Sequence, residues 1–211
     1  FCLCPRGTGG IMGHRKGLWR MKLVVCFPGI GYHCDKPLLY YSRKLAAAAG
    51  YDHEIALNYT YRKARLRGND AALREAFDAL YAQAETQLAT VDWAEYDDVL
   101  FLSKSIGTAV AAAYARRNDV VCRHALYTPL ALTFEFAPQK AIAFLGTADP
   151  WSDVDAVAAR SRANGTPLHL YAGANHSLET ADVLGNLDAL RDVMQKTQAF
   201  VAGENFTVVE N

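Results

Sequence analysis

The chain lacks an excess of charge of either sign, since lysine plus arginine and aspartate plus glutamate each number 22 among 211 residues. Binding to nucleic acid or to an anionic membrane surface through overall charge needs a basic excess. The sequence also has no apolar run of the roughly 18 residues that cross a bilayer. We therefore expect no nucleic acid and no membrane as a partner.

Cysteine is scarce and scattered. The five residues are odd in number and form no paired motif: Cys2, Cys4, Cys26, Cys34 and Cys122. Reduced thiols in a cytoplasmic protein are the simplest interpretation of this pattern. No set of histidine, cysteine and carboxylate residues has the spacing of a zinc site, so we expect no metal and no other cofactor.

The composition of the chain fits one globular domain, because 51% of the residues are hydrophobic and 21% are charged. Residues 1–20 show neither a helical nor a strand period, and we expect a disordered extension there. The domain is expected over 21–201 and a tail over 202–211. The sequence does not indicate an oligomeric state.

Strands and helices alternate along the domain, and several strands are apolar throughout. This pattern predicts an open, mostly parallel sheet with helices on both faces. In such sheets, ligands bind beyond the carboxyl ends of the strands. Strands are expected at 22–27, 53–58, 99–102, 120–127, 141–145 and 167–171, and helices at 38–49, 70–91, 109–117, 152–161 and 180–201.

Ser105 stands at an abrupt change from strand to helix. The apolar run Val99–Leu102 leads into it, and the helix-forming run Ala109–Arg117 follows. Such a turn lifts a serine hydroxyl clear of the sheet beside the positive end of a helix, as in a nucleophile elbow. An ordinary turn with Ser105 as a helix N-cap is the alternative.

Two further polar residues follow later strands and should reach the same edge of the sheet. Asp149 follows the strand at 141–145, and His176 follows the last strand. A serine becomes a nucleophile when an imidazole removes its proton, and a carboxylate holds that imidazole in place. The backbone amide of Ile106 and an amide from the Gly29–Gly31 turn after the first strand can stabilise an oxyanion.

In this arrangement the chain resembles the α/β-hydrolases, and more narrowly a group of small bacterial serine hydrolases of uncertain substrate. The matching segments are Phe27–Tyr32, Ser103–Thr108, Gly146–Trp151 and Ala174–Glu179. The resemblance implies an α/β-hydrolase domain over 21–201. It also implies cofactor-independent cleavage of a small ester-like substrate, with Ser105 as nucleophile, Asp149 as orienting acid, His176 as base and the Ile30 and Ile106 amides as oxyanion hole.

The chain departs from that family at two places. Ser103 stands where the Gly-x-Ser-x-Gly elbow has its first glycine, although a small side chain is retained. The connection at 129–140 is also too short for a large helical lid. A minimal fold with an open, shallow site is therefore expected.

Residues near the expected site are candidates for substrate contact. Aromatic side chains could bind an acyl chain or a ring, or could belong to the core. Lys104 could meet an anionic substrate group or form a surface ion pair. The candidates are Tyr32, Lys104, Tyr127 and Trp151, with Tyr40 and Phe134 as further aromatics.

Other interpretations remain open at this stage. Glu135 rivals Asp149 as the triad acid. A catalytically silent binding protein with the same fold is the alternative to an enzyme. The basic run from Arg62 to Arg67 could form a phosphate clamp for a phosphate-ester hydrolase, although a solvated loop explains it as well.

Overall fold

A six-stranded, wholly parallel sheet forms the centre of the structure, a computed structural model that describes residues 21–62 and 66–203. The spatial order of the strands is β2-β1-β3-β4-β5-β6. Their bounds are β1 Lys22–Phe27, β2 His53–Ala56, β3 Asp98–Lys104, β4 Arg123–Tyr127, β5 Ala141–Gly146 and β6 Leu168–Tyr171. The predicted open parallel sheet is thereby confirmed.

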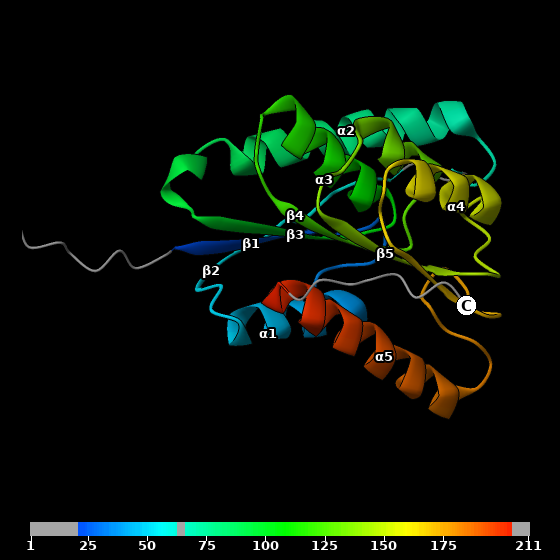
Figure 1. Cartoon of the computed structure of the whole chain (residues 1–211). Helices are drawn as coiled ribbons and strands as arrows, with labels where there is room; N and C mark the ends of the chain where they lie inside the picture. The colour runs from blue at the N-terminus through cyan, green and yellow to red at the C-terminus, as the bar shows by residue number, and fades with distance from the viewer. Residues whose placement is uncertain (1–20, 63–65, 204–211) are drawn as a thin grey trace, which may run out of the picture.

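Helices cover both faces of this sheet (Figure 1). One face carries α1 and α5, which also pack on each other. The opposite face carries α2, α3 and α4. The bounds are α1 Pro37–Ala48, α2 Asp70–Leu88, α3 Ile106–Arg117, α4 Val154–Ala163 and α5 Val183–Ala202, with the short 3₁₀ helices η1 Trp93–Glu95 and η2 Ala131–Phe136.

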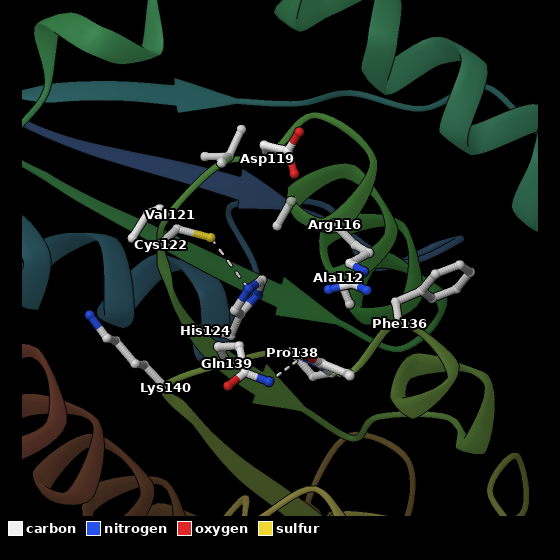
Figure 2. Close-up of a pocket in the computed structure, with 13 residues that line it drawn as sticks. Ala112, Arg116, Asp119, Val121, Cys122, His124, Phe136, Pro138, Gln139 and Lys140 are labelled. Carbon is white, nitrogen blue, oxygen red and sulfur yellow. Dashed lines mark hydrogen bonds between the residues drawn. The ribbon is translucent and has the colours of Figure 1, made fainter.

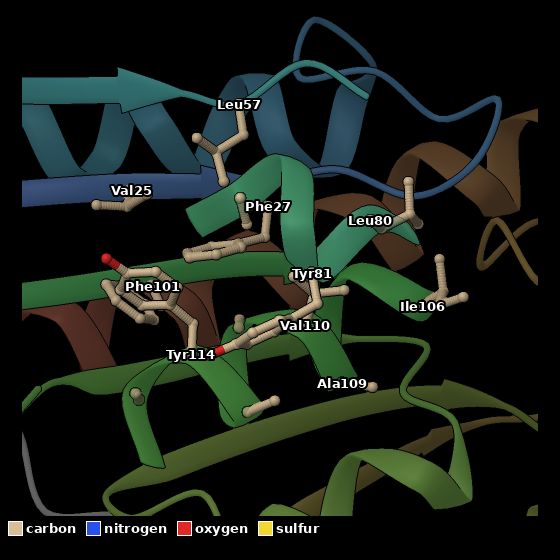
Figure 3. Close-up of a cluster of buried hydrophobic side chains, with 14 of the residues drawn as sticks. Val25, Phe27, Leu57, Leu80, Tyr81, Phe101, Ile106, Ala109, Val110 and Tyr114 are labelled. Atoms are coloured by element: carbon tan, nitrogen blue, oxygen red, sulfur yellow. The ribbon is translucent and has the colours of Figure 1, made fainter. Parts of the chain in front are cut away.

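The two faces of the sheet explain why the central strands are apolar throughout. Side chains alternate between faces along a strand, and here both faces are buried. Phe27 and Phe101 point to the α2 and α3 side, with their ring centroids 4.7 Å apart, and Tyr114 of α3 packs against them (Figure 3). Leu100 and Leu102 point to the α1 and α5 side.

Helix α3 lies nearest the centre of the fold. Every residue from Ile106 to Ala115 is buried, and the many alanines let the helix axis approach the sheet closely. Three of the other helices begin at side-chain caps that the sequence provides, whereas α1 begins after Lys36 without such a cap. Asn69, Asp153 and Asp182 accept hydrogen bonds from the first backbone amides of α2, α4 and α5, respectively.

Some of the segments predicted from the sequence lie outside the residues that the structure describes. The predicted extension at 1–20 and residues 204–211 of the predicted tail lie outside the described residues, as do Lys63 and Arg65 of the basic run. Within the described part, Cys26, Cys34 and Cys122 are free, buried thiols. No helix there combines the length and apolarity that crossing a membrane requires.

Candidate active site

Ser105 occupies a strained turn between β3 and α3. Its backbone has φ 58° and ψ −130°, a conformation that side chains other than glycine rarely adopt. The Ser105 amide donates to the carbonyl oxygen of Tyr127 at 2.9 Å, which holds the turn onto β4. Strain of this kind is the geometry expected of a nucleophile elbow, and it differs from an ordinary N-cap because Ser105 makes no side-chain cap bond to α3.

Two small residues allow this turn to form. A Cβ atom at Gly107 would lie 2.3 Å from the carbonyl oxygen of Pro28, so only glycine lets α3 start so close to the end of β1. Ser103, in place of the usual first glycine, is fully buried and its hydroxyl donates to the Ala125 carbonyl oxygen at 3.2 Å. The hydroxyl is thus accommodated within the sheet.

Ser105, His176 and Asp149 form a continuous hydrogen-bonded chain. The distance from His176 Nε2 to Ser105 Oγ is 2.7 Å, and that from His176 Nδ1 to Asp149 Oδ2 is also 2.7 Å. An Nδ1–H that donates to the carboxylate leaves Nε2 free to accept the serine proton. The other carboxylate oxygen, Oδ1, accepts from the backbone amide of Trp151 at 2.9 Å. Asp149 is therefore fixed through both oxygens.

The loop that carries His176 is held by local contacts. The Ala148 amide donates to the Ala174 carbonyl oxygen at 3.0 Å. The Asn175 side-chain oxygen accepts from the amides of Ser177 at 2.7 Å and Glu179 at 3.3 Å, which closes a compact turn around the histidine. Buried Leu178 anchors the turn in the core.

A turn of four residues, Gly29 to Tyr32, lies against the nucleophile. Tyr32 and Gly29 exchange two backbone hydrogen bonds, and Gly31 has φ +72°. A Cβ atom at Gly29 would lie 3.1 Å from Ser105 Cβ. The turn therefore brings the Ile30 amide close to Ser105. Ile106 is the first residue of α3, so its amide has no partner within the helix and lies at the positive helix end.

A cavity of about 240 Å³ opens at this edge of the sheet. Ser105 and His176 line it together with both proposed oxyanion residues, Ile30 and Ile106. The other lining residues are Gly31, Tyr32, Lys36, Leu66, Leu73, Lys104, Leu130, Trp151 and Ser177. The Trp151 ring is half-exposed and its centroid is 5.9 Å from that of His176.

Burial lowers the pKa of His176, and the charge of Lys104 lowers it further. The hydrogen bond that His176 donates to Asp149 opposes this shift. The histidine is therefore neutral at neutral pH, which is the form that can accept a proton. Burial also favours the neutral form of Tyr32, whose pKa is raised to about 12. The neutral Tyr32 hydroxyl accepts a hydrogen bond from the Leu38 amide at 3.1 Å.

Two of the sequence candidates lie away from this cavity. Tyr127 was expected to border the site, but it is fully buried between the sheet and the α1 and α5 layer. Its hydroxyl bonds Ser42 at 2.6 Å and Thr197 at 2.9 Å, which makes it a core residue. Glu135, which lies on η2, forms ion pairs with Arg74 and Arg160. It does not contact His176.

Other pocket residues have no distinctive sequence signal. Leu66 and Leu73 flank the start of α2, and Leu130 precedes η2. As ordinary apolar residues, they could not be separated from the core in the sequence. Lys36 stands at the N-cap of α1.

A larger hollow, of about 350 Å³, lies at the opposite edge of the sheet (Figure 2). Cys122 Sγ lies 3.3 Å from His124 Nε2 there. Burial raises the pKa of Cys122 and lowers that of His124 to about 4, so both groups are neutral. A nucleophilic thiolate needs the opposite shift of the thiol pKa. Cys122 and His124 therefore do not form a thiolate nucleophile with its base, and the cavity at Ser105 is the candidate active site.

Comparison with protein-family models and with curated protein sequences finds no match. Solved structures do resemble the chain. Est1E from Butyrivibrio proteoclasticus, with ferulic acid bound, has a TM-score of 0.61 and 12% identity, and the match covers 88% of this chain and 90% of that one.

Two further structures show the same likeness. The esterase Pf2001 from Pyrococcus furiosus has a TM-score of 0.56 and 12% identity, with 86% and 83% of the two chains covered. An alpha-beta serine hydrolase homologue from Coxiella burnetii has a TM-score of 0.54 and 15% identity, with 83% and 84% covered. Together with the parallel sheet and its two helical layers, these matches show that the chain has the α/β-hydrolase fold.

Proposed function

We propose that the protein is a serine hydrolase that cleaves a small ester-like substrate through an acyl-enzyme. The observation that carries this proposal is the hydrogen-bonded chain from Ser105 Oγ through His176 to Asp149, with 2.7 Å at each step. A binding protein has no need of a strained serine backbone aligned with a fixed imidazole and carboxylate. The likeness to esterases of the same fold adds support.

In the proposed reaction, Ser105 Oγ attacks the carbonyl carbon while His176 Nε2 takes the hydroxyl proton. The carbonyl oxygen becomes an oxyanion, which the Ile30 and Ile106 amides stabilise. The carbon–oxygen bond to the alcohol then breaks, and His176 returns its proton to the departing alkoxide. Water attacks the acyl-enzyme with His176 again as base, releasing the acid and restoring Ser105.

A covalent probe tests the nucleophile. We expect a fluorophosphonate to label Ser105, and Ser105→Ala to abolish both labelling and turnover of p-nitrophenyl acetate. Asp149→Asn should lose about 10⁴-fold in rate because the imidazole would be held in the wrong tautomer. Glu135→Gln is the matched control and should retain activity. Full turnover by Ser105→Ala would disprove the proposal.

The oxyanion hole can be tested by deleting one backbone donor. The Gly29–Tyr32 turn has its left-handed residue at Gly31, the third position, as in a type II turn, where proline is favoured at the second position. Ile30→Pro should therefore fold, with a ring carbon in place of the Ile30 N–H hydrogen. We expect a loss of about 10²–10³-fold in kcat, whereas Ile30→Val should behave like the natural enzyme.

A silent binding protein is the competing function, and its supports are the Ser103 departure from the elbow pattern and the short 129–140 connection, which holds no large lid. The buried Ser103 hydroxyl is bonded to Ala125 and leaves the turn intact. This favours a working elbow. We further propose that the substrate is a small molecule and that the reaction needs no cofactor.

A further inference from the structure

Lys104 is a charged residue at a strand position that faces the apolar layer between the sheet and helices α1 and α5. It is the last residue of β3 and, by the strand alternation, lies on the same face as Leu100 and Leu102, towards α1 and α5. Only 1% of its surface is exposed. It nevertheless lines the Ser105 cavity, so its small exposed part faces the site.

The Lys104 ammonium has no counter-ion among the described residues. No carboxylate there lies within ion-pair distance of Nζ, and no hydrogen bond to it is formed. Asp149 is the acid whose charge acts on it most, but both Asp149 oxygens are already engaged by His176 and Trp151. A buried ammonium without a partner is costly, so the position needs an explanation.

Lys36 adds a second positive charge near Nζ of Lys104. Nζ of Lys104 lies 4.9 Å from the centroid of the Tyr32 ring, and Nζ of Lys36 lies 5.3 Å from the same centroid. Two ammonium groups thus share one aromatic ring, and all three residues line the cavity. Burial and the nearby Lys36 lower the pKa of Lys104 to about 7, against the opposing charge of Asp149.

The cavity therefore has two chemically different ends. Leu66 and Leu130, which belong to the core on the α2 and α3 face, form an apolar end with Leu73. Tyr32, Lys36 and Lys104 form the cationic end on the α1 side. Ser105 and His176 lie in the same cavity. A bound ester would place one substituent against leucines and the other against ammonium groups.

We propose that the substrate carries a carboxylate, which binds at the Lys36–Tyr32–Lys104 end of the cavity while the ester carbonyl meets Ser105. This inference rests on the proposed hydrolase function and specifies its substrate class. Each lysine ammonium is a compact point charge that donates to an anionic oxygen, and a carboxylate has one oxygen for each of the two lysines. The carboxylate would supply the counter-ion that Lys104 lacks. It could belong to the acyl half or to the alcohol half of the ester.

Two matched substrate pairs distinguish these halves. The acyl half is tested with the mono-p-nitrophenyl ester of glutaric acid against the corresponding p-nitrophenyl glutaramate, which is neutral and of equal size. The alcohol half is tested with 4-acetoxybenzoate against 4-acetoxybenzamide. In each pair, the ratio of kcat/KM for the anionic and neutral ester is measured after subtraction of spontaneous hydrolysis.

We expect a ratio above one in one pair, and a fall of that ratio by roughly tenfold or more in Lys104→Met, because a charge-assisted bond is lost. Lys36→Met should lower the same ratio and provides a second variant should Lys104→Met fail to fold. Lys44→Met is the matched control, since Lys44 also lies over a tyrosine ring, that of Tyr40, but does not line the cavity. Its ratio should equal that of the natural protein.

Binding without turnover gives an independent readout. Monomethyl glutarate should bind Ser105→Ala in calorimetry, and the added change Lys104→Met should abolish that binding. Equal kcat/KM for both members of both pairs would overturn the carboxylate proposal while leaving the hydrolase proposal intact. Turnover that survives in Ser105→Ala would instead overturn the hydrolase proposal itself.

Discussion

Gly146, the last residue of β5, lies directly against the carbonyl of Ala174: a Cβ atom at position 146 would stand 2.1 Å from that oxygen. The loop that carries His176 thus crosses the end of the strand in contact with its backbone. No side chain fits between them.

Gly146→Ala should therefore push this loop away and displace His176 from Ser105. We expect a loss of about 10²-fold in kcat/KM, the effect of a misplacement of about 1 Å in a catalytic group. Gly165→Ala is the control, because an added Cβ at position 165, where φ is +69°, has no atoms within 4 Å. The measurement is kcat/KM of both variants in an esterase assay. Unaltered kcat/KM in Gly146→Ala would contradict the prediction that the added methyl displaces His176.

The strained backbone at Ser105 predicts an unusual order of stability. Ser105→Gly relieves about 1–3 kcal/mol of strain, against about 0.5–1 kcal/mol for the greater freedom of glycine in the unfolded chain. We expect Ser105→Gly to be more stable than Ser105→Ala by about 1 kcal/mol in chemical denaturation. At Ala159, an exposed residue in the interior of α4, the order should reverse, with Ala159→Gly less stable than the natural protein. Equal stability of the two Ser105 variants would show that the turn is relaxed.

His176, the proposed proton acceptor, should determine the acid limb of the pH–rate profile. Because the pKa of His176 is lowered, kcat/KM should fall only below about pH 6.5, when the imidazole becomes protonated. Lys104 is protonated at that pH and opposes the second positive charge. Lys104→Met should therefore move the acid limb to higher pH. An acid limb that stays in place would mean that the two charges do not interact, and Lys44→Met serves as the control.

Burial of Lys104 also predicts how stability depends on pH. Its pKa is about 7 in the folded protein, against an ordinary value of 10.5. Between these two values the unfolded chain holds a proton that the folded protein has released. The contribution of Lys104 to the free energy of unfolding therefore rises with pH across this window, by up to about 1.4 kcal/mol per pH unit.

Below about pH 7 both states are protonated, and the full penalty of the buried ammonium remains. The measurement compares urea denaturation of the natural protein and of Lys104→Met from pH 7 to pH 10. Lys104→Met should be the more stable of the two at pH 7, and its advantage should shrink as the pH rises. A constant difference would contradict the burial of an uncompensated ammonium.

The order of the elements and the segments of the site could be predicted from the sequence because each depends on local pattern. Apolar runs bounded by glycine and proline define the strands. The residues after three parallel strands must meet at one edge, which brings Ser105, Asp149 and His176 together. The contact of His176 with Asp149 and not with Glu135 depends on tertiary structure, since both acids follow strands in the sequence.

The walls of the cavity could not be predicted in this way. Tyr127 pairs with Lys104 in the sheet register, and both lie near the strand ends. Nevertheless, Tyr127 belongs to the core and Lys104 to the cavity. The difference depends on which helices cover each position, which is a property of tertiary packing. Leu66 and Leu73 line the cavity for the same reason, and their sequence pattern is that of any buried stripe.

The connection between β4 and β5 holds only the short η2 helix, and Glu135 joins it to α2 through Arg74 and to α4 through Arg160. Leu130, at the start of this connection, is one wall of the cavity. No part of residues 128–140 has to swing aside before a substrate can enter. Motion of this connection should then not limit turnover. In kinetic terms, kcat should be insensitive to the viscosity of the solvent, and added sucrose should leave it unchanged.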